Sequence, residues 1–128
     1  MRDVVVVGSL NCDLVMRVAR LPSPGETVPA SGLDTFVGGK GCNQAIAASR
    51  AGAKVAMVGR VGSDTYGELV LDSLRGAGVD VGGVSVDPGE GTGVAQIFVD
   101  AAGANMIAVA PRANAALAES DVDAARER

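Results

Sequence analysis

The chain has 128 residues and a formal net charge of −4, and 48% of its residues are hydrophobic. This length predicts one domain or one part of a larger domain, and aromatic residues make up only 2%, so the core must be aliphatic. The lack of a Lys/Arg cluster and the scarcity of aromatic side chains argue against nucleic-acid binding.

The rarer residue types limit the chemistry further. There is no histidine, which excludes Ser-His-Asp and Cys-His catalysis within the chain and makes a catalytic zinc site unfavourable. Cys12 and Cys42 are too few for a disulfide framework, so a reducing, cytoplasmic location is expected. The valine run at residues 4–7 is too short to cross a membrane and lacks the flanks of a signal peptide, which predicts no contact with a membrane.

The predicted elements alternate between strands and helices. Strands are expected at residues 3–10, 14–18, 54–58 and 84–86, with a further extended segment at 27–37. Helices are expected at residues 42–50, 65–75 and 121–128, the second capped by Asp64 and the third by Ser120. This order predicts an α/β layered core with a parallel-type sheet and flanking helices.

Two extended regions do not fit the alternation of strands and helices. Residues 92–100 and 105–110 predict a hairpin with Gly103 in its turn. Together with residues 14–37, the region 92–110 is expected to form a small accessory sheet. No internal repeat or low-complexity linker divides the chain, so residues 1–128 are treated as one unit.

The segment 38–43, Gly-Gly-Lys-Gly-Cys-Asn, is the most informative stretch. Its glycines let the backbone approach a ligand closely, and it precedes a helix N-terminus, where free N–H groups point outward. Lys40 adds one charge, and Asn43 adds an amide that both donates and accepts. The spacing fits neither a P-loop, because Gly41 stands at the Ser/Thr position, nor a dinucleotide fingerprint, because Gln44 stands at the third glycine.

A second polar cluster follows the first predicted strand. Asn11 and Asp13 come at its carboxyl end, which is where open α/β sheets bind ligands. Amide and carboxylate groups suit neighbouring sugar hydroxyls, because together they donate and accept hydrogen bonds. Taken singly, each cluster has an alternative interpretation: a structural turn that enters a helix, or a solvated turn.

Together the clusters resemble the ribokinases, in the PfkB family of carbohydrate kinases. The resemblance runs along nearly the whole chain, in a fixed order, through residues 8–13, 24–27, 38–45, 59–67, 91–95 and 114–117. It implies a ribokinase-like layered fold in which Asn11 and Asp13 hydrogen-bond sugar hydroxyls. The other wall of the sugar pocket would comprise Gly39, Lys40, Gly41 and Asn43.

The same resemblance implies a lid and a partner. The accessory strands, at about residues 14–37 and 92–110, would close over the sugar, with Ala95 and Ile97 on the inner apolar face. A kinase gains from such closure because water must be kept away from ATP. In ribokinases the lid also forms the contact between subunits, so a homodimer is implied.

The resemblance also implies chemistry that this chain does not contain. The family's cofactors are ATP, Mg²⁺ and a monovalent cation (K⁺), and its catalytic base and anion hole belong to a later Gly-Ala-Gly-Asp motif. The nucleotide-binding half, the monovalent-cation loop and the Mg-linked residues are likewise expected outside these residues. The stretch 76–80 is only superficially similar, because it has an inserted Val79 and follows a helix, so Asp80 is not predicted to be catalytic. No catalytic or metal-binding residue is therefore predicted here.

The expected protein is the N-terminal, ribose-binding portion of an ATP-dependent kinase, a truncation or fragment that is inactive alone. Two alternatives stay open: another PfkB-type sugar or nucleoside kinase, and a catalytically incomplete binding or dimerisation module.

The sequence departs from the family pattern at two places. Arg112 stands where a small, glycine-containing run is usual, and Cys12 and Cys42 stand where alanine is common. The cysteines are either small core residues or thiols whose alkylation impairs sugar binding.

Overall fold

The computed structural model describes residues 2–126. Its elements, in chain order, are β1 (Val4–Val7), β2 (Asn11–Val18), β3 (Ala30–Gly38), α1 (Lys40–Arg50), β4 (Val55–Gly62), α2 (Thr65–Gly76), β5 (Asp80–Asp87), β6 (Gly93–Val99), β7 (Asn105–Ala110), the 3-10 helix η1 (Arg112–Ala116) and α3 (Glu119–Ala125). Within these residues no helix is both long enough and apolar enough to span a membrane.

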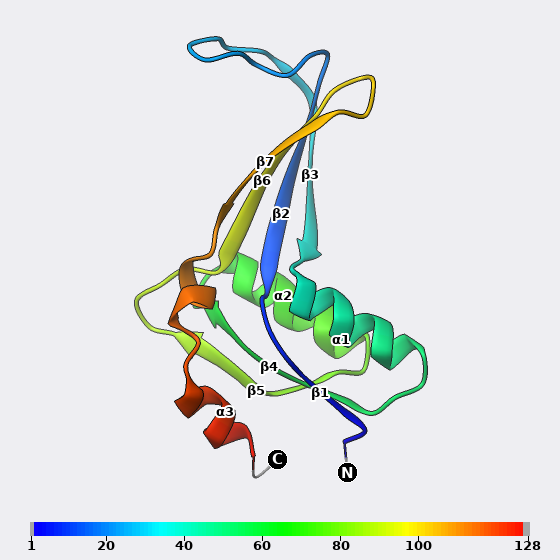
Figure 1. Ribbon diagram of the computed structural model, residues 1–128, viewed down its shortest axis with the longest axis vertical. Helices are drawn as coiled ribbons and strands as arrows, with labels where there is room; N and C mark the ends of the chain where they lie inside the picture. The colour runs from blue at the N-terminus through cyan, green and yellow to red at the C-terminus, as the bar shows by residue number, and fades with distance from the viewer. Residues whose placement is uncertain (1, 127–128) are drawn as a thin grey trace.

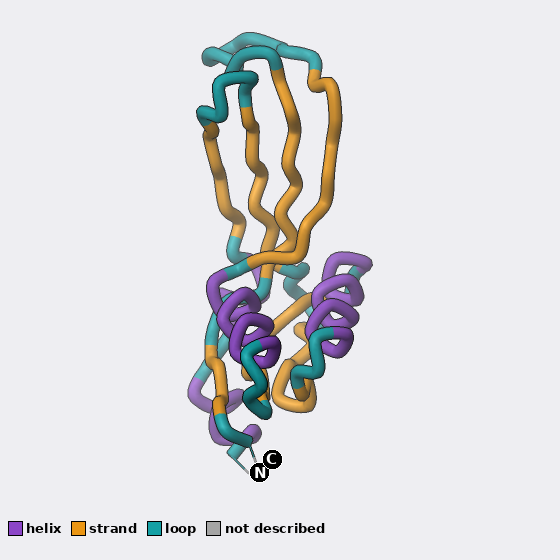
Figure 2. The backbone as a smooth tube through the Cα atoms, turned by 90° about the vertical axis from the view of Figure 1, so that its right-hand side faces the viewer, coloured by secondary structure: helices purple, strands orange, loops and turns teal. Residues whose placement is uncertain are grey.

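The strands form two separate sheets. The first is parallel, with the order β1-β4-β5, and the second is mixed, with the order β3-β2-β6-β7. In the mixed sheet β2 runs parallel to β6 and antiparallel to β3, and β6 and β7 form an antiparallel hairpin. The mixed sheet projects as a long blade from the α/β part of the molecule, and the two ends of the described chain lie at the opposite end (Figures 1 and 2).

Helices cover both faces of the parallel sheet. α1 and α2 pack on one face, and α3 packs on the other, against β4 and β5 (Figure 1). The core beneath α1 and α2 is aliphatic, as the composition predicts, and its largest fully buried side chains include Leu10, Met57 and Leu74. β1 is less well covered: Val6 faces the core, whereas Val5 and Val7 point to the face that carries α3, which packs on β4 and β5, and they are 57% and 48% exposed.

A buried polar junction joins α2 to the mixed sheet. Asp64 caps α2 by accepting from the Gly67 N–H at 2.8 Å, and it also accepts from the Thr92 N–H at 3.0 Å and the Thr92 hydroxyl at 2.6 Å. Thr92 is fully buried, and its hydroxyl accepts from the Gly62 N–H at 2.9 Å. The residue that leads into β6 is thereby held against the end of β4.

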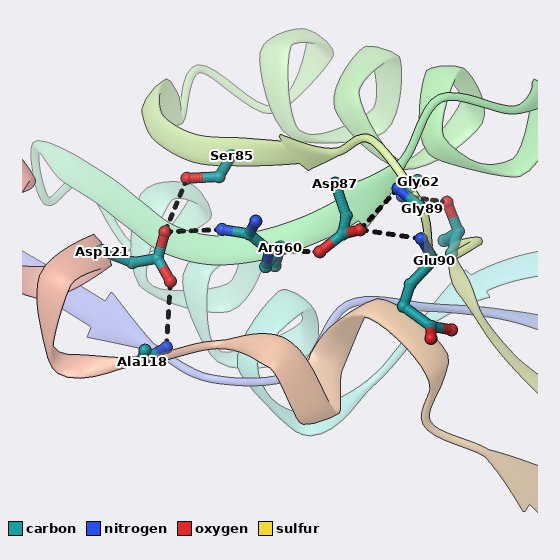
Figure 3. Close-up of polar contacts among 9 residues, drawn as sticks. Arg60, Gly62, Ser85, Asp87, Gly89, Glu90, Ala118 and Asp121 are labelled. Atoms are coloured by element: carbon teal, nitrogen blue, oxygen red, sulfur yellow. Dashed lines mark hydrogen bonds and ion pairs between the residues drawn. The ribbon is translucent and has the colours of Figure 1, made fainter.

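An ionic network holds α3 on the parallel sheet (Figure 3). Arg60 of β4 donates to Asp87 at 2.7 Å and to Asp121 at 2.8 Å. Asp121 also accepts from the Ser85 hydroxyl and from the Ala118 N–H at the start of α3. The Arg60 guanidinium and two backbone N–H groups lower the pKa of Asp87 to about 2.

Most predicted elements are confirmed, with shifted ends. The hairpin is present, with Gly103 in its turn at φ +86°, and the helix at 42–50 begins earlier, at Lys40. The first strand is shorter than predicted, because the chain must pass from one sheet to the other after Val7. Asn11 therefore begins β2 instead of extending β1.

The prediction for the last helix was wrong in one respect. Ser120 does not cap it: Ala118 is the N-cap, and the Asp121 carboxylate reaches back to the Ala118 N–H at 2.9 Å. The carboxylate at the third helical position thus makes one half of a capping box, because it satisfies the N–H of the N-cap residue, while alanine supplies no side-chain acceptor for the first turn. The predicted helix end at residue 128 lies outside the described residues.

Candidate functional site

The site lies where the turn between β1 and β2 meets the N-terminus of α1. Gly39 adopts φ +94°, and a Cβ there would come within 2.7 Å of the Ser9 carbonyl oxygen, so only glycine fits without strain. That carbonyl accepts from the Cys42 N–H at 3.0 Å, and α1 has no side-chain cap. The Ser9 carbonyl, in the turn between β1 and β2, therefore satisfies a free N–H group in the first turn of α1.

The two polar clusters of the sequence share a pocket of about 420 Å³, called here the Asn11 pocket. Its lining comes from the β1–β2 turn, the start of α1 and the segment after β7, and comprises Ser9, Asn11, Gly39, Lys40, Asn43, Val109, Pro111 and Asn114. Lys40 and Asn43 are exposed, whereas Asn11 is half-buried. The pocket thus offers amide groups and one cation on polar walls, with an apolar contribution from the returning strand.

Asp13 lies beside this pocket, on the same face of β2 as Asn11, although it is not part of the lining. A Cβ on Gly38 would overlap its carboxylate, so this glycine provides the space that the carboxylate occupies. Burial raises the pKa of Asp13. Among residues 2–126 this carboxylate has no hydrogen-bonding or ionic partner, which leaves both oxygens available to a ligand.

Asn114 is a site residue to which the sequence analysis gave no role. Its side chain bridges to the other end of the chain, where its Oδ1 accepts from the Leu10 N–H at 2.9 Å and its Nδ2 donates to the Leu10 carbonyl at 3.0 Å. The same Nδ2 donates to Asn11 Oδ1 at 2.8 Å. The one available sequence signal for Asn114 was its place in the Asn-Ala-Ala-Leu run at residues 114–117, but no local pattern indicates that this run packs against residue 10.

The other predicted site residues occupy different positions. Gly41 is buried and packs on the backbone of Gly8 and Ser9, so it sets the distance between the turn and the helix and does not line the pocket. Ala95 pairs with Asp13 and Ile97 pairs with Val15, which puts both on the pocket face of the mixed sheet. They lie further along the blade than the lining residues. Within residues 2–126 no group of His, Cys, Asp or Glu could hold a metal ion.

Other hollows have less suitable chemistry. One of about 460 Å³ lies between β3, α1 and α2, and another of about 500 Å³ lies at the tip of the blade. The lining of the first hollow contains no carboxylate, and the carboxylate of the second, Asp100, already accepts two backbone N–H groups. Neither hollow therefore offers the combination found at the Asn11 pocket, where amide side chains lie beside a carboxylate that has no partner among residues 2–126. Asn43 borders both the first of these and the Asn11 pocket, so the two hollows share one wall.

Both cysteines are core residues. Cys12 and Cys42 are free thiols with no exposed surface, and the Cys12 thiol donates to the Tyr66 carbonyl at 3.6 Å. Burial, followed by nearby negative groups, raises the pKa of each thiol to about 11. Cys12 points to the opposite face of β2 from Asn11 and Asp13, which fits the interpretation of small core residues.

These thiols predict a loss of stability in alkali. Between about pH 9 and pH 11 the unfolded chain ionises its cysteines while the folded chain keeps them protonated, so the free energy of unfolding falls as pH rises. Each thiol contributes up to about 1.4 kcal/mol per pH unit to the slope. Urea unfolding at pH 8, 9 and 10 measures it, and Cys12→Ala should make the slope shallower. A slope unchanged by both Cys12→Ala and Cys42→Ala would contradict this explanation.

Arg112 has an unusual backbone conformation. Its φ of +51° is the one positive value for a non-glycine among residues 2–126. The guanidinium lies over Gly91, where a side chain would overlap it, and is 3.7 Å from Asp64 Oδ2. It points away from the Asn11 pocket, to which Pro111 and Asn114 contribute from this segment. The charge of Arg112 therefore lies outside the lining of the pocket.

The left-handed conformation at residue 112 predicts an order of stabilities. Arg112→Gly should be more stable than Arg112→Ala by about 1 kcal/mol, because both lose the guanidinium but only alanine keeps the steric penalty. Urea unfolding of the two variants measures the difference. Ala47→Gly, at an exposed helical position of α1, is the matched control and should lose about 1 kcal/mol. A glycine variant no more stable than the alanine variant would contradict the strain.

Known protein structures share this fold. Ribokinase of Giardia lamblia superposes with a TM-score of 0.88 at 36% identity, over 98% of this chain and 38% of that chain. Arabidopsis thaliana ribokinase, solved with ribose and ATP, gives a TM-score of 0.79 at 38% identity, over 86% of this chain and 36% of that chain. The architecture is therefore that of the ribokinase-like α/β proteins.

Sequence comparison gives the family. The chain belongs to the pfkB family of carbohydrate kinases, whose model matches residues 1–127. It is 42% identical to ribokinase of Schizosaccharomyces pombe, over 100% of this chain and 42% of that protein. It is 37% identical to deoxyribokinase of Salmonella typhi, over 98% of this chain and 41% of that protein. The chain thus spans about two fifths of the length of these curated relatives.

Proposed function

We propose that this chain is the sugar-binding portion of an ATP-dependent kinase that converts D-ribose to D-ribose 5-phosphate. The observation that carries the proposal is the half-buried Asp13 carboxylate, which has no partner within the described residues 2–126 and lies beside a pocket lined by Asn11, Lys40 and Asn43. A buried carboxylate needs strong hydrogen bonds to offset its lost hydration. Neighbouring hydroxyls of a sugar supply such donors, and the amide groups complete a set suited to a polyol.

Ribose is the leading substrate because ribokinases are similar over the whole chain and one of them is solved with ribose. The similarity to a deoxyribokinase keeps 2-deoxyribose as an alternative within the same mechanism. In either case this chain's residues bind and orient the sugar. Asp13 accepts hydroxyl protons, Asn11 and Asn43 fix the ring by their amide groups, and Lys40 adds a positive charge at the pocket rim.

The phosphoryl-transfer groups are assigned outside this chain. ATP is the cofactor that the family implies, with Mg²⁺ and K⁺ beside it, but the local geometry at residues 76–80 does not fit a phosphate site. The Ala77 and Gly78 N–H groups bond to the last carbonyl oxygens of α2, so they cannot receive an anion. Asp80 is paired with Arg2 and accepts from the Gly82 N–H. We therefore expect the chain to bind sugar without phosphorylating it.

The mixed sheet is proposed as the lid and as the contact with a second copy. Large apolar side chains on its surface are more than half exposed, among them Phe36, Ile107 and Val109. These three belong to the same face as Asp13, because Asp13 pairs with Phe36 and Ala95, and β6 pairs with β7. Such a face suits a cover over the sugar that a second subunit completes. Ile107→Glu should then favour the monomer in analytical ultracentrifugation.

Ribose-dependent thermal stabilisation tests the proposal. Ribose should raise the melting temperature of the chain in proportion to log concentration above the dissociation constant, whereas glycerol at equal concentration should not. The Asp13→Ala variant should show no rise in melting temperature with ribose. A melting temperature that responds equally to ribose and glycerol would refute the sugar site, and ATP-dependent formation of ribose 5-phosphate by this chain would refute the assignment of catalysis elsewhere.

The free state of the two buried cysteines supports a reducing, cytoplasmic setting for the proposed kinase.

A further inference from the structure

Asn11 can present either its oxygen or its NH₂ group to a ligand, and the surrounding hydrogen bonds determine which. The decisive neighbour is Asn114, whose amide forms a fork on the backbone of Leu10. The Leu10 N–H can only donate and the Leu10 carbonyl can only accept, so the fork allows one orientation of the Asn114 amide. Asn114 therefore has its Nδ2 on the side of the Leu10 carbonyl.

The orientation of the Asn114 amide determines the orientation of the Asn11 amide. Asn114 Nδ2 lies 2.8 Å from the Asn11 side chain, and because Nδ2 can only donate, the atom that faces it must be Asn11 Oδ1. The two protons of Asn114 Nδ2 are then both used, one by the Leu10 carbonyl and one by Asn11. Asn11 Nδ2 has no protein partner among residues 2–126.

The space for this link depends on Gly93. A Cβ at residue 93 would overlap both Asn11 Oδ1 and Asn114 Nδ2. Gly93 is buried and pairs with Asn11 in the parallel β2–β6 ladder, so the link crosses directly over its Cα. Three segments far apart in sequence thus meet at one amide pair, beside the pocket that both asparagines line.

We propose that Asn114 is a positioning residue that makes Asn11 a hydrogen-bond donor to the bound sugar. The inference rests on the proposed sugar-binding function, and it gives the pocket a defined polarity. Asn11 Nδ2 donates to a hydroxyl oxygen, and the Asp13 carboxylate accepts a hydroxyl proton. A hydroxyl group can satisfy both partners, whereas a group that only donates or only accepts satisfies one of them.

Amide-proton exchange tests the orientation without a sugar. In the ¹⁵N-labelled chain, both side-chain NH₂ protons of Asn114 should be protected from exchange with water, and those of Asn11 should exchange rapidly. Asn43, an exposed amide in the same pocket, is the reference for unprotected exchange. Rapid exchange at Asn114, or protection at Asn11, would overturn the assignment. This result does not depend on whether the chain binds ribose.

A double-mutant cycle on ribose affinity tests the consequence. Asn114→Ala and Asn11→Ala should each weaken binding by about 3- to 10-fold, as expected for one hydrogen bond, and the double variant should be no weaker than Asn11→Ala alone. Calorimetric stoichiometry reports the folded fraction separately, so a loss of stability is not counted as a loss of affinity. Gly93→Ala, which keeps both asparagines, should match Asn114→Ala.

The control pair is Asn114→Ala with Asn43→Ala, whose effects should multiply because Asn43 is on the opposite wall. Multiplying effects for Asn11 and Asn114 would overturn the positioning role, since Asn114 would then act independently of Asn11. Unchanged affinity in Asn114→Ala would overturn it as well. If the unsubstituted chain binds no ribose, the proposed function fails, and the exchange measurement still decides the orientation of Asn11.

Discussion

Asp13→Asn should raise the melting temperature of the folded chain at pH 7 while weakening ribose binding by at least about tenfold. The substitution removes a half-buried charge that has no partner in the part of the chain that the structure describes, and burial already raises the pKa of this carboxyl. It also removes an ionised acceptor, and hydrogen bonds to charged groups are worth about 1.5 to 3 kcal/mol. Stability should therefore rise while ribose affinity falls, which is the usual trade-off when a binding residue destabilises the free protein.

The pH dependence follows from the raised pKa. The folded state disfavours ionised Asp13, so the penalty that Asp13→Asn relieves is present when the carboxylate is charged and disappears once pH falls below the unfolded value of about 3.9. The gain in melting temperature should accordingly be present at pH 7 and absent at pH 3. Differential scanning calorimetry at both values measures it.

Asp34→Asn is the matched control for Asp13→Asn. Asp34 lies on the neighbouring strand β3, on the same face of the sheet, and is paired with Arg17 at 2.6 Å in an exposed ion pair. Its replacement should cost at most about 1 kcal/mol and leave ribose affinity unchanged. A destabilised Asp13→Asn variant, or one that binds ribose normally, would contradict the role of Asp13.

Gly41→Ala should destabilise the chain by about 1 to 3 kcal/mol and impair the Asn11 pocket. A Cβ at residue 41 would lie 2.7 Å from Gly8 C and from Ser9 N. Both atoms belong to the backbone, so relief requires α1 to move away from the β1–β2 turn. Such a movement stretches the bond between the Cys42 N–H and the Ser9 carbonyl and widens the gap between Asn11 and Lys40.

The same substitution at a different glycine is the control for Gly41→Ala. Gly76 ends α2, and a Cβ there would have no neighbour within 4 Å. Gly76→Ala should leave ribose affinity unchanged and stabilise the chain by up to about 1 kcal/mol, because alanine is the better helix former. Urea unfolding measures both variants. Equal stabilities for Gly41→Ala and Gly76→Ala would show that the turn tolerates a wider spacing.

Much of the architecture could be predicted from local patterns. Helix α2 has a capping Asp64 and a following Gly78, and these signals act within a few residues of the helix. The pocket residues Asn11 and Asn43 were identifiable because each accompanies a recognisable transition: Asn11 follows the valine-rich strand and its Gly-Ser turn, and Asn43 lies in the first turn of a helix. Such signals do not require knowledge of the rest of the chain.

What escaped prediction depends on contacts over long sequence distances. Asn114 reaches Leu10 across 104 positions, and nothing near residue 114 indicates that contact. Gly41 was assigned to the pocket because glycines suit ligand contact, but backbone packing on Gly8 is an equally strong reason for a glycine. The left-handed φ of Arg112 was also hidden, because arginine gives no sign of a conformation that glycine usually adopts.

The most direct test of the central claim is to map D-ribose onto the chain by amide chemical shifts in a ¹⁵N-labelled sample. If ribose binds in the Asn11 pocket, saturable changes are expected at Asn11, Gly39, Lys40 and Asn43. These residues come from two segments, and Asn114 adds a third segment to the same pocket. Asp13→Asn should abolish these changes. Saturable changes confined to the hollow beside Phe36 and Arg50 or to the blade tip near Asp100, or no changes at all, would contradict the account.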